Sequence, residues 1–108
     1  MNTIDTDAIN RRMAELQGWT HPHEAGLWLH PDRSRGDSFH LLPDYCHDPT
    51  LTSPLINAEK VIHIDRLRDG DWLCALGLYD SGVRLGTSYE IAYCLAHIAR
   101  ADAGEKQG

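Results

Sequence analysis

The sequence predicts an α+β protein in which an antiparallel four-stranded sheet packs with three helices as an α-β-α sandwich. Two observations support this prediction. Apolar residues recur at helical spacing in three segments, and four short apolar runs bounded by turn residues lie between those segments. The strand-like runs come in two consecutive pairs, each typical of a β-hairpin, so the expected order is helix, strand, strand, helix, strand, strand, helix. Hairpins that alternate with helices favour an antiparallel sheet covered by those helices.

The clearest strand prediction lies at residues 71–79, the longest apolar run in the chain. Asp-Gly precedes this run and Asp-Ser-Gly follows it, and both are turn signals. A run of this length between two turns fits a strand better than a helix, and residues 83–85 can return antiparallel as its partner. Residues 27–30 and 38–42 form the other predicted hairpin, which a polar loop connects.

Three segments predict helices. The first covers residues 3–17, where apolar side chains recur at i, i+4 and i+7. The second covers 53–68, because it starts with Ser-Pro, a favoured N-cap followed by a favoured first helical residue. The third covers about 88–100, and the spacing of Thr87 and Glu90 predicts a capping box at its start. The predicted core positions are Ile9, Met13, Ile62, Leu76, Ile91, Leu95 and Ile98.

Length and composition indicate one small acidic domain. The 108 residues are expected to fold over 1–100, with a polar tail over 101–108 that we expect to be mobile. Hydrophobic residues make up 42% of the chain, which argues against disorder. The net charge is −6 and the basic residues form no extended run, so we expect no direct binding to nucleic acid. An acidic surface favours either solubility alone or a basic partner.

The sequence predicts neither export nor a membrane span. The N-terminus lacks a basic stretch followed by an apolar one, so no signal peptide is expected. No apolar run approaches membrane-spanning length. Cys46, Cys74 and Cys94 are odd in number and have no paired spacing, which is typical of free thiols in a reducing cytosol.

Histidine and cysteine residues in the loops are the candidates for metal binding or catalysis. His21, His23, Cys46 and His47 would be the ligands of a zinc site, but the spacing of structural zinc sites is absent. A Cys-His nucleophile needs the two side chains to meet, and adjacent residues on an extended segment point in opposite directions. We therefore expect no metal, no cofactor and no catalytic residue.

Acidic residues in the loops are better candidates for a binding surface. Asp32, Asp37, Asp44 and Asp48 lie around the first hairpin and the segment that leaves it, with Tyr45 among them as a possible aromatic anchor. Aromatic side chains with charged neighbours are typical of the residues that dominate protein interfaces. We predict that these five residues bind the partner.

The order of several short motifs resembles the phage ABA sandwich domain family, small proteins of phages and prophages. The resemblance covers about residues 8–100. Its motifs are a helix over 9–16 that ends at Gly18-Trp19, a Leu-Pro-Asp-Tyr segment at 42–45, an Ala-Glu-Lys-Val segment at 58–61, a Trp-bearing strand and a C-terminal helix over 87–99. The resemblance implies an α-β-α layered fold and a phage origin, and it implies no enzyme activity.

These observations together favour a small phage- or prophage-encoded accessory protein of the host cytoplasm. We expect it to be a monomer or small homo-oligomer that binds a basic host or phage protein without catalysis. A sharper hypothesis is an inhibitor of a host defence or nucleic-acid-binding protein, of the anti-CRISPR or anti-restriction type. One alternative is a small metal-dependent enzyme or metal-binding module that uses the His and Cys loops. Another is a structural or self-assembling phage protein.

Overall fold

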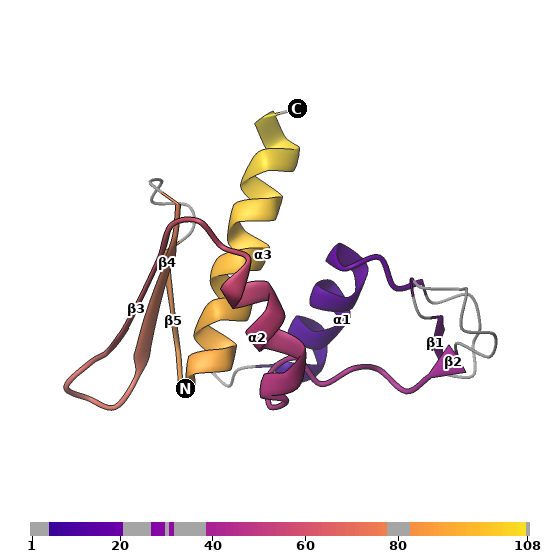
Figure 1. Cartoon of the computed structure of the whole chain (residues 1–108), viewed down its shortest axis with the longest axis horizontal. Helices are drawn as coiled ribbons and strands as arrows, with labels where there is room; N and C mark the ends of the chain where they lie inside the picture. The colour runs from indigo at the N-terminus through magenta and orange to yellow at the C-terminus, as the bar shows by residue number, and fades with distance from the viewer. Residues whose placement is uncertain (1–4, 21–26, 30, 32–38, 78–82, 108) are drawn as a thin grey trace.

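The computed structural model describes residues 5–20, 27–29, 31, 39–77 and 83–107. Over these residues it contains three helices and five strands, so the protein belongs to the α+β class, as predicted (Figure 1). In chain order the elements are α1 (Thr6–Leu16), β1 (Trp28–Leu29), β2 (Phe39–His40), α2 (Pro49–Asn57), β3 (Ile62–Arg66), β4 (Trp72–Leu76), β5 (Val83–Gly86) and α3 (Tyr89–Gln107).

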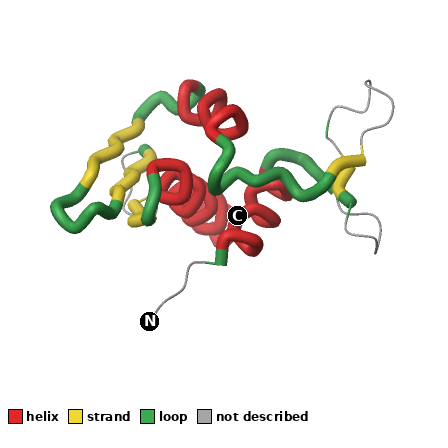
Figure 2. The backbone as a smooth tube through the Cα atoms, turned by 90° about the horizontal axis from the view of Figure 1, so that it is seen from below, coloured by secondary structure: helices red, strands yellow, loops and turns green. Residues whose placement is uncertain are grey.

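The described strands form two separate antiparallel sheets. β3, β4 and β5 make a three-stranded sheet in that order, in which Cys74 lies opposite Ile64 on one side and Arg84 on the other. β1 and β2 make a two-stranded sheet, which Thr20 extends by an isolated bridge to Leu29. Figures 1 and 2 show this second sheet at the opposite end of the molecule. The predicted single four-stranded sheet is therefore wrong, because the first hairpin lies too far from the second to pair with it.

α2 begins at Pro49, before the predicted start at residue 53. Asp48 is its N-cap, and the Asp48 carboxylate accepts a hydrogen bond from the backbone N–H of Thr50 at 3.0 Å. Pro49 occupies the first helical position, where a missing N–H is tolerated. Asp-Pro is thus the start signal that we expected Ser-Pro to provide, and Pro54 lies inside the helix.

β3 lies where the sequence analysis predicts the second half of a helix over 53–68. The side chains of Ile62 and Ile64 pack against the core, whereas His63 and Asp65 between and after them are exposed. A period of two is that of a half-buried strand. Because β3 pairs with β4 over its whole length, the helix prediction is wrong for this segment.

The helices lie on one side of the three-stranded sheet. α3 packs against β4 and β5, and α1 and α2 pack against α3 (Figure 1). Figure 2 shows the same arrangement from below, with α3 between the sheet and α1. The opposite face of the sheet is covered by none of the described elements. Within the described residues the helices therefore do not form the predicted α-β-α sandwich, which requires helices on both faces.

The core lies where α3 meets the sheet and α1. Four of the predicted core residues are buried there, as expected: Ile9, Met13, Leu76 and Ile91. The other three are partly buried and pack against that core: Ile62, Leu95 and Ile98. Among the described helices, none combines the length and the apolarity that crossing a membrane requires.

The start and the end of α3 both differ from the prediction. Ser88 caps the helix, because its hydroxyl accepts a hydrogen bond from the N–H of Ile91 at 3.2 Å. The N-cap is therefore Ser88 and not the predicted Thr87, and Ile91 at the third helical position has no polar side chain to complete a capping box. α3 continues to Gln107, beyond the predicted end near Arg100, so most of the segment predicted as a polar tail over 101–108 is helical.

Candidate functional site

A groove runs along α1, between this helix and the segments on either side of the two-stranded sheet. Two adjoining depressions of about 530 Å³ and about 540 Å³ form it, and Arg11 and Trp28 line both. We call this feature the α1 groove. Its walls are Thr6, Asp7, Asn10, Arg11 and Glu15 from α1, and Trp19, Thr20, Trp28, Leu41, Leu42, Asp44 and His47 from the segments opposite.

One wall of the α1 groove is apolar. Trp28 is buried, Leu42 is half-buried and Leu41 is 78% exposed. An exposed leucine beside buried apolar residues loses water contact when a partner covers it, and that loss of water contact favours binding. This wall therefore provides a contact area for an apolar side chain of a partner.

The other feature of the α1 groove is an excess of negative charge. Among the lining residues, Asp7, Glu15 and Asp44 supply three carboxylates against the guanidinium of Arg11, which gives a formal charge of −2 with His47 neutral. Arg12, next to the lining, reaches Glu15 only at 4.0 Å and lies closer to Asp102, at 2.6 Å. Arg11 Nε lies 3.0 Å from Asp7 Oδ2, and both side chains are more than half exposed. A groove of this charge attracts cationic groups.

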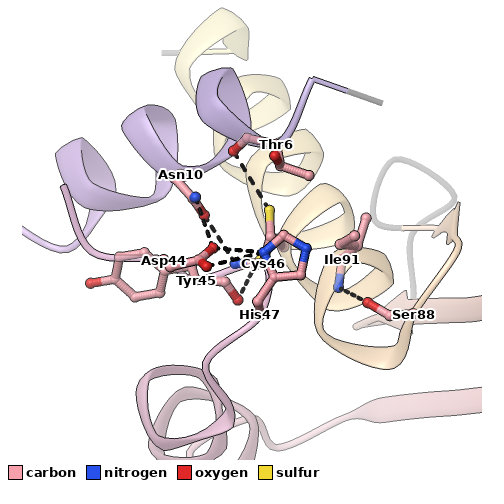
Figure 3. Close-up of polar contacts among 9 residues, drawn as sticks. Thr6, Asn10, Asp44, Tyr45, Cys46, His47, Ser88 and Ile91 are labelled. Carbon is pink, nitrogen blue, oxygen red and sulfur yellow. Dashed lines mark hydrogen bonds and ion pairs between the residues drawn. The ribbon is translucent and has the colours of Figure 1, made fainter. Parts of the chain in front are cut away.

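Asn10 attaches the bend at residues 44–47 to α1. Its side-chain N–H donates to Asp44 Oδ1 at 3.0 Å, and its Oδ1 accepts the backbone N–H of Cys46 at 2.9 Å (Figure 3). Asn10 is 8% exposed, so its bond to Cys46 is sheltered from water, whereas its bond to the half-exposed Asp44 is sheltered on one side only. One buried amide thus holds Asp44 in the wall of the α1 groove.

Asp44 and His47 form a carboxylate–imidazole pair. His47 Nδ1 lies 3.0 Å and 3.1 Å from the two carboxylate oxygens of Asp44 (Figure 3). Partial burial opposes the charged form of Asp44, but the hydrogen bonds with Asn10 and His47 outweigh that effect and lower its pKa. Asp44 therefore keeps its negative charge in the groove at neutral pH.

Cys46 does not join His47 as a nucleophile. The Cys46 thiol is 1% exposed and its Sγ donates to the backbone oxygen of Thr6 at 3.7 Å (Figure 3). Cys94 is fully buried beside it, and its Sγ donates to the backbone oxygen of Tyr45 at 3.7 Å. The hydrogen bond with Cys46, together with burial, raises the pKa of Cys94. These contacts support the fold at the junction of α1, α3 and the bend.

Tyr45, the predicted aromatic anchor, belongs to the core. It is 4% exposed, and its hydroxyl accepts a hydrogen bond from Trp19 Nε1 at 3.2 Å. Burial raises its pKa, against the opposing effect of that hydrogen bond. A side chain with so little exposed surface cannot contact a partner unless the bend opens, so the anchor assignment is corrected.

The four predicted acidic residues do not all reach the α1 groove. Asp44 lines it. Asp48 lies at the start of α2, where its carboxylate accepts the N–H and the hydroxyl of Thr50 at 3.0 Å and 2.6 Å. Asp32 and Asp37 lie outside the described residues. The structure thus places Asp44 in the wall of the α1 groove and Asp48 at the N-cap of α2, and the partner-binding role of these acids stays a prediction.

The described residues contain no group of three or more His, Cys, Asp or Glu side chains arranged to hold a metal ion. Of the candidate ligands, His21 and His23 lie outside the described part of the chain. Cys46 and His47 are described and diverge, since the thiol is buried and the imidazole is exposed.

Sequence reasoning missed most of the α1 groove. Asn10 was detectable in principle, because it lies between Ile9 and Met13 on the buried stripe of α1, where an amide needs partners. Asp7 and Arg11 form an ordinary i,i+4 pair on the wet side of a helix, which predicts no site. Their position opposite Leu41 follows only from the tertiary structure.

We compared the chain with protein-family models, with curated proteins and with solved structures, and no match was found in any of the three comparisons.

Proposed function

We propose that this protein is a non-catalytic binding module that holds a basic, partly apolar segment of a partner protein in the α1 groove. One observation carries the proposal: the apolar wall around Leu41 faces a helix whose groove-lining residues give the site a formal charge of −2. Productive protein interfaces combine an apolar centre with a polar rim. A segment with an aromatic or aliphatic side chain flanked by Lys or Arg fits both features.

The partner class that we propose is a protein with a basic surface, such as one that binds nucleic acid. The net charge of −6 for the chain would steer such a partner toward it over a distance set by the salt concentration. An accessory protein of phage type that inhibits a host defence protein is the narrower form of this proposal. That narrower form rests on the sequence resemblance to the phage ABA sandwich family alone, to which neither the described fold nor the comparison with family models adds support.

The catalytic alternative has less support. A carboxylate–imidazole pair such as Asp44 and His47 can act as a general base only with a nucleophile, a metal or a water in reach. The nearest candidate nucleophile in sequence, Cys46, is bonded to the backbone of Thr6 instead. The Asp44–His47 contact also closes a turn, since the His47 N–H donates to the backbone oxygen of Asp44 at 3.2 Å. A structural role for the pair is therefore sufficient.

Nuclear magnetic resonance with defined peptides tests this proposal. The labelled protein would be titrated with Arg- and Lys-rich peptides that carry one aromatic residue, and with the same peptides after replacement of the basic residues by Glu. We expect shifts at Asp7, Arg11, Leu41 and Asp44 with the basic peptides only. Shifts confined to other elements, or equal shifts with the acidic peptides, would reject the α1 groove as the binding site.

Two groove variants and one control sharpen the experiment. Leu41→Ser removes an exposed apolar side chain, and Asp7→Lys combined with Glu15→Lys reverses two exposed charges. Both should weaken peptide binding and leave the fold intact, since exposed positions contribute little to stability. Asp69→Lys reverses one exposed charge in the β3–β4 turn, which is half the charge change of the double groove variant, and should bind as the parent does.

A further inference from the structure

The three-stranded sheet leaves one face without a covering layer in the described structure. Ile62, Ile64 and Trp72 pack on the side of α3. The residues that alternate with them along β3 and β4 therefore point to the opposite face of the sheet. This second face, which we call the open face, consists of Val61, His63, Asp65, Leu73, Ala75 and Leu85. Val61 and Leu85 are 47% and 51% exposed, although both are large apolar residues. Figure 1 shows that α3 lies on the other side of the sheet.

The open face is suited to a second copy of the same chain by charge. Each molecule carries a net charge of −6, so two copies repel each other least when they meet through a surface of low charge. The open face has a single carboxylate, that of Asp65, and His63 Nε2 lies 2.6 Å from its Oδ2. Both side chains are more than half exposed, so both can reach across an interface.

The register of the strands makes this face complementary to itself. Ile64, Cys74 and Arg84 lie in one row across the sheet. Consider a two-fold axis that runs along this row, perpendicular to the strands, between two copies whose open faces meet. On each strand, this axis places the residue that precedes the row in one copy over the residue that follows the row in the other copy. On β3 this puts His63 of each copy over Asp65 of the other, which gives two equivalent contacts. On β4 it puts Leu73 of each copy over Ala75 of the other. An imidazole that can donate a hydrogen bond therefore meets a carboxylate, and a large residue meets a small one, in the same arrangement.

We infer that the open face is a homodimer interface in which His63 of each copy meets Asp65 of the other. Face-to-face sheets pack with their strands within about 30° of each other, which such an axis allows. Three strands at about 4.8 Å spacing and five residues at about 3.3 Å cover an area of about 14 Å by about 17 Å. This planar area, about 240 Å², is well below the area of about 800 Å² that stable interfaces bury on each partner, so we expect a weak and concentration-dependent dimer.

Charge-reversal variants test both the interface and the position of its axis. His63→Asp places two carboxylates over each other at both symmetric contacts, and Asp65→Lys places a lysine over histidine. Each variant alone should raise the dimer dissociation constant about tenfold or more. An equimolar mixture of the two should dimerise again, because the carboxylate introduced in one variant then meets the ammonium group introduced in the other. Sedimentation velocity over a range of concentrations measures all three.

Control variants separate this inference from changes in the fold. Ser53→Asp on α2 and Glu15→Lys on α1 make the same charge changes away from the open face and should dimerise as the parent does. Leu85→Glu should also weaken the dimer, and circular dichroism identifies any variant that unfolds. A parent chain that stays monomeric at every concentration would overturn the inference. So would a dimer that these reversals leave unchanged, or two weakened variants that fail to restore dimerisation on mixing.

Discussion

The side-chain oxygen of Asn10 accepts the backbone N–H of Cys46 at 2.9 Å, so a buried residue of α1 fixes the bend that forms the opposite wall of the α1 groove. The same amide donates to Asp44 at 3.0 Å. A single side chain thus satisfies two polar groups of the bend, at positions 36 and 34 residues away in sequence. Asn10 therefore holds in place the bend that forms one wall of the α1 groove.

Replacing Asn10 should therefore lower the free energy of unfolding by more than the loss of a small polar side chain alone would. Asn10→Ala leaves the sheltered N–H of Cys46 without its acceptor, and an unsatisfied group of this kind costs about 1–3 kcal/mol. Urea unfolding of the variant and the parent measures the difference. Asn57→Ala is the matched control, because Asn57 is exposed near the end of α2. Equal stabilities for the Asn10 and Asn57 variants would contradict the role given to Asn10.

The N-cap of α3 is Ser88 in the structure, whereas the sequence pattern predicts Thr87. Ser88→Ala should lower the free energy of unfolding by about 0.5–2 kcal/mol, because Ile91 then loses its N-terminal acceptor. Thr87 is exposed, so Thr87→Ala should change it by less than about 0.5 kcal/mol. Thermal melts of the two variants decide the question. The reverse order of effects would restore the capping box predicted from the sequence.

The fold could be predicted in part because local signals and tertiary contacts agree in much of the chain. The core positions Met13 and Leu76 follow from spacing alone. The segment at Ile62 could not be predicted in the same way, because its apolar residues match both a helical stripe and a strand, and pairing with β4 decides the outcome. Ile64 and Leu67 lie off that helical stripe, which is a local sign that the helix does not continue through this segment.

The candidate site was harder to predict than the fold, because its residues come together only in the tertiary structure. Asp44 was identified from composition, as an acid in a loop. Its neighbour Tyr45 looked equally available, but the turn directs Tyr45 into the core against Trp19. Leu41 falls within the predicted strand over 38–42, and nothing in the sequence distinguishes an exposed leucine from a buried one at the end of an apolar run.

The stability of the protein should depend on pH through His97. Tyr93 Oη lies 3.3 Å from its Nδ1, the Gln17 amide lies 3.2 Å from its Nε2, and Arg100 lies 3.5 Å from Nδ1. Burial first, and then the charge of Arg100, lower the pKa of His97 below its usual value of 6.5, against the opposing effect of Glu59. The unfolded chain therefore binds a proton more readily than the folded chain does.

The stability that His97 contributes is complete above its unfolded pKa of about 6.5, and it decreases as the pH falls from there through the lowered folded pKa. We expect the urea concentration at the unfolding midpoint to decrease as the pH is lowered from 8 to 5. The His97→Gln variant should show a smaller decrease. His63, which is exposed on β3, provides the control variant His63→Gln, measured at dilute concentration. An unchanged pH dependence in the His97 variant would show that other groups cause it.

The measurement that most directly tests the central proposal is the affinity of a basic, aromatic-containing peptide across a salt series. Calorimetry would compare the parent with the combined Asp7→Lys and Glu15→Lys variant, and with the Asp69→Lys control. If the α1 groove attracts cationic groups, the parent affinity should fall as salt rises toward about 1 M, where the screening length is about 3 Å. The groove variant should bind weakly at every salt concentration, and the control should follow the parent. Binding that is independent of salt and equal in all three proteins would contradict the proposal.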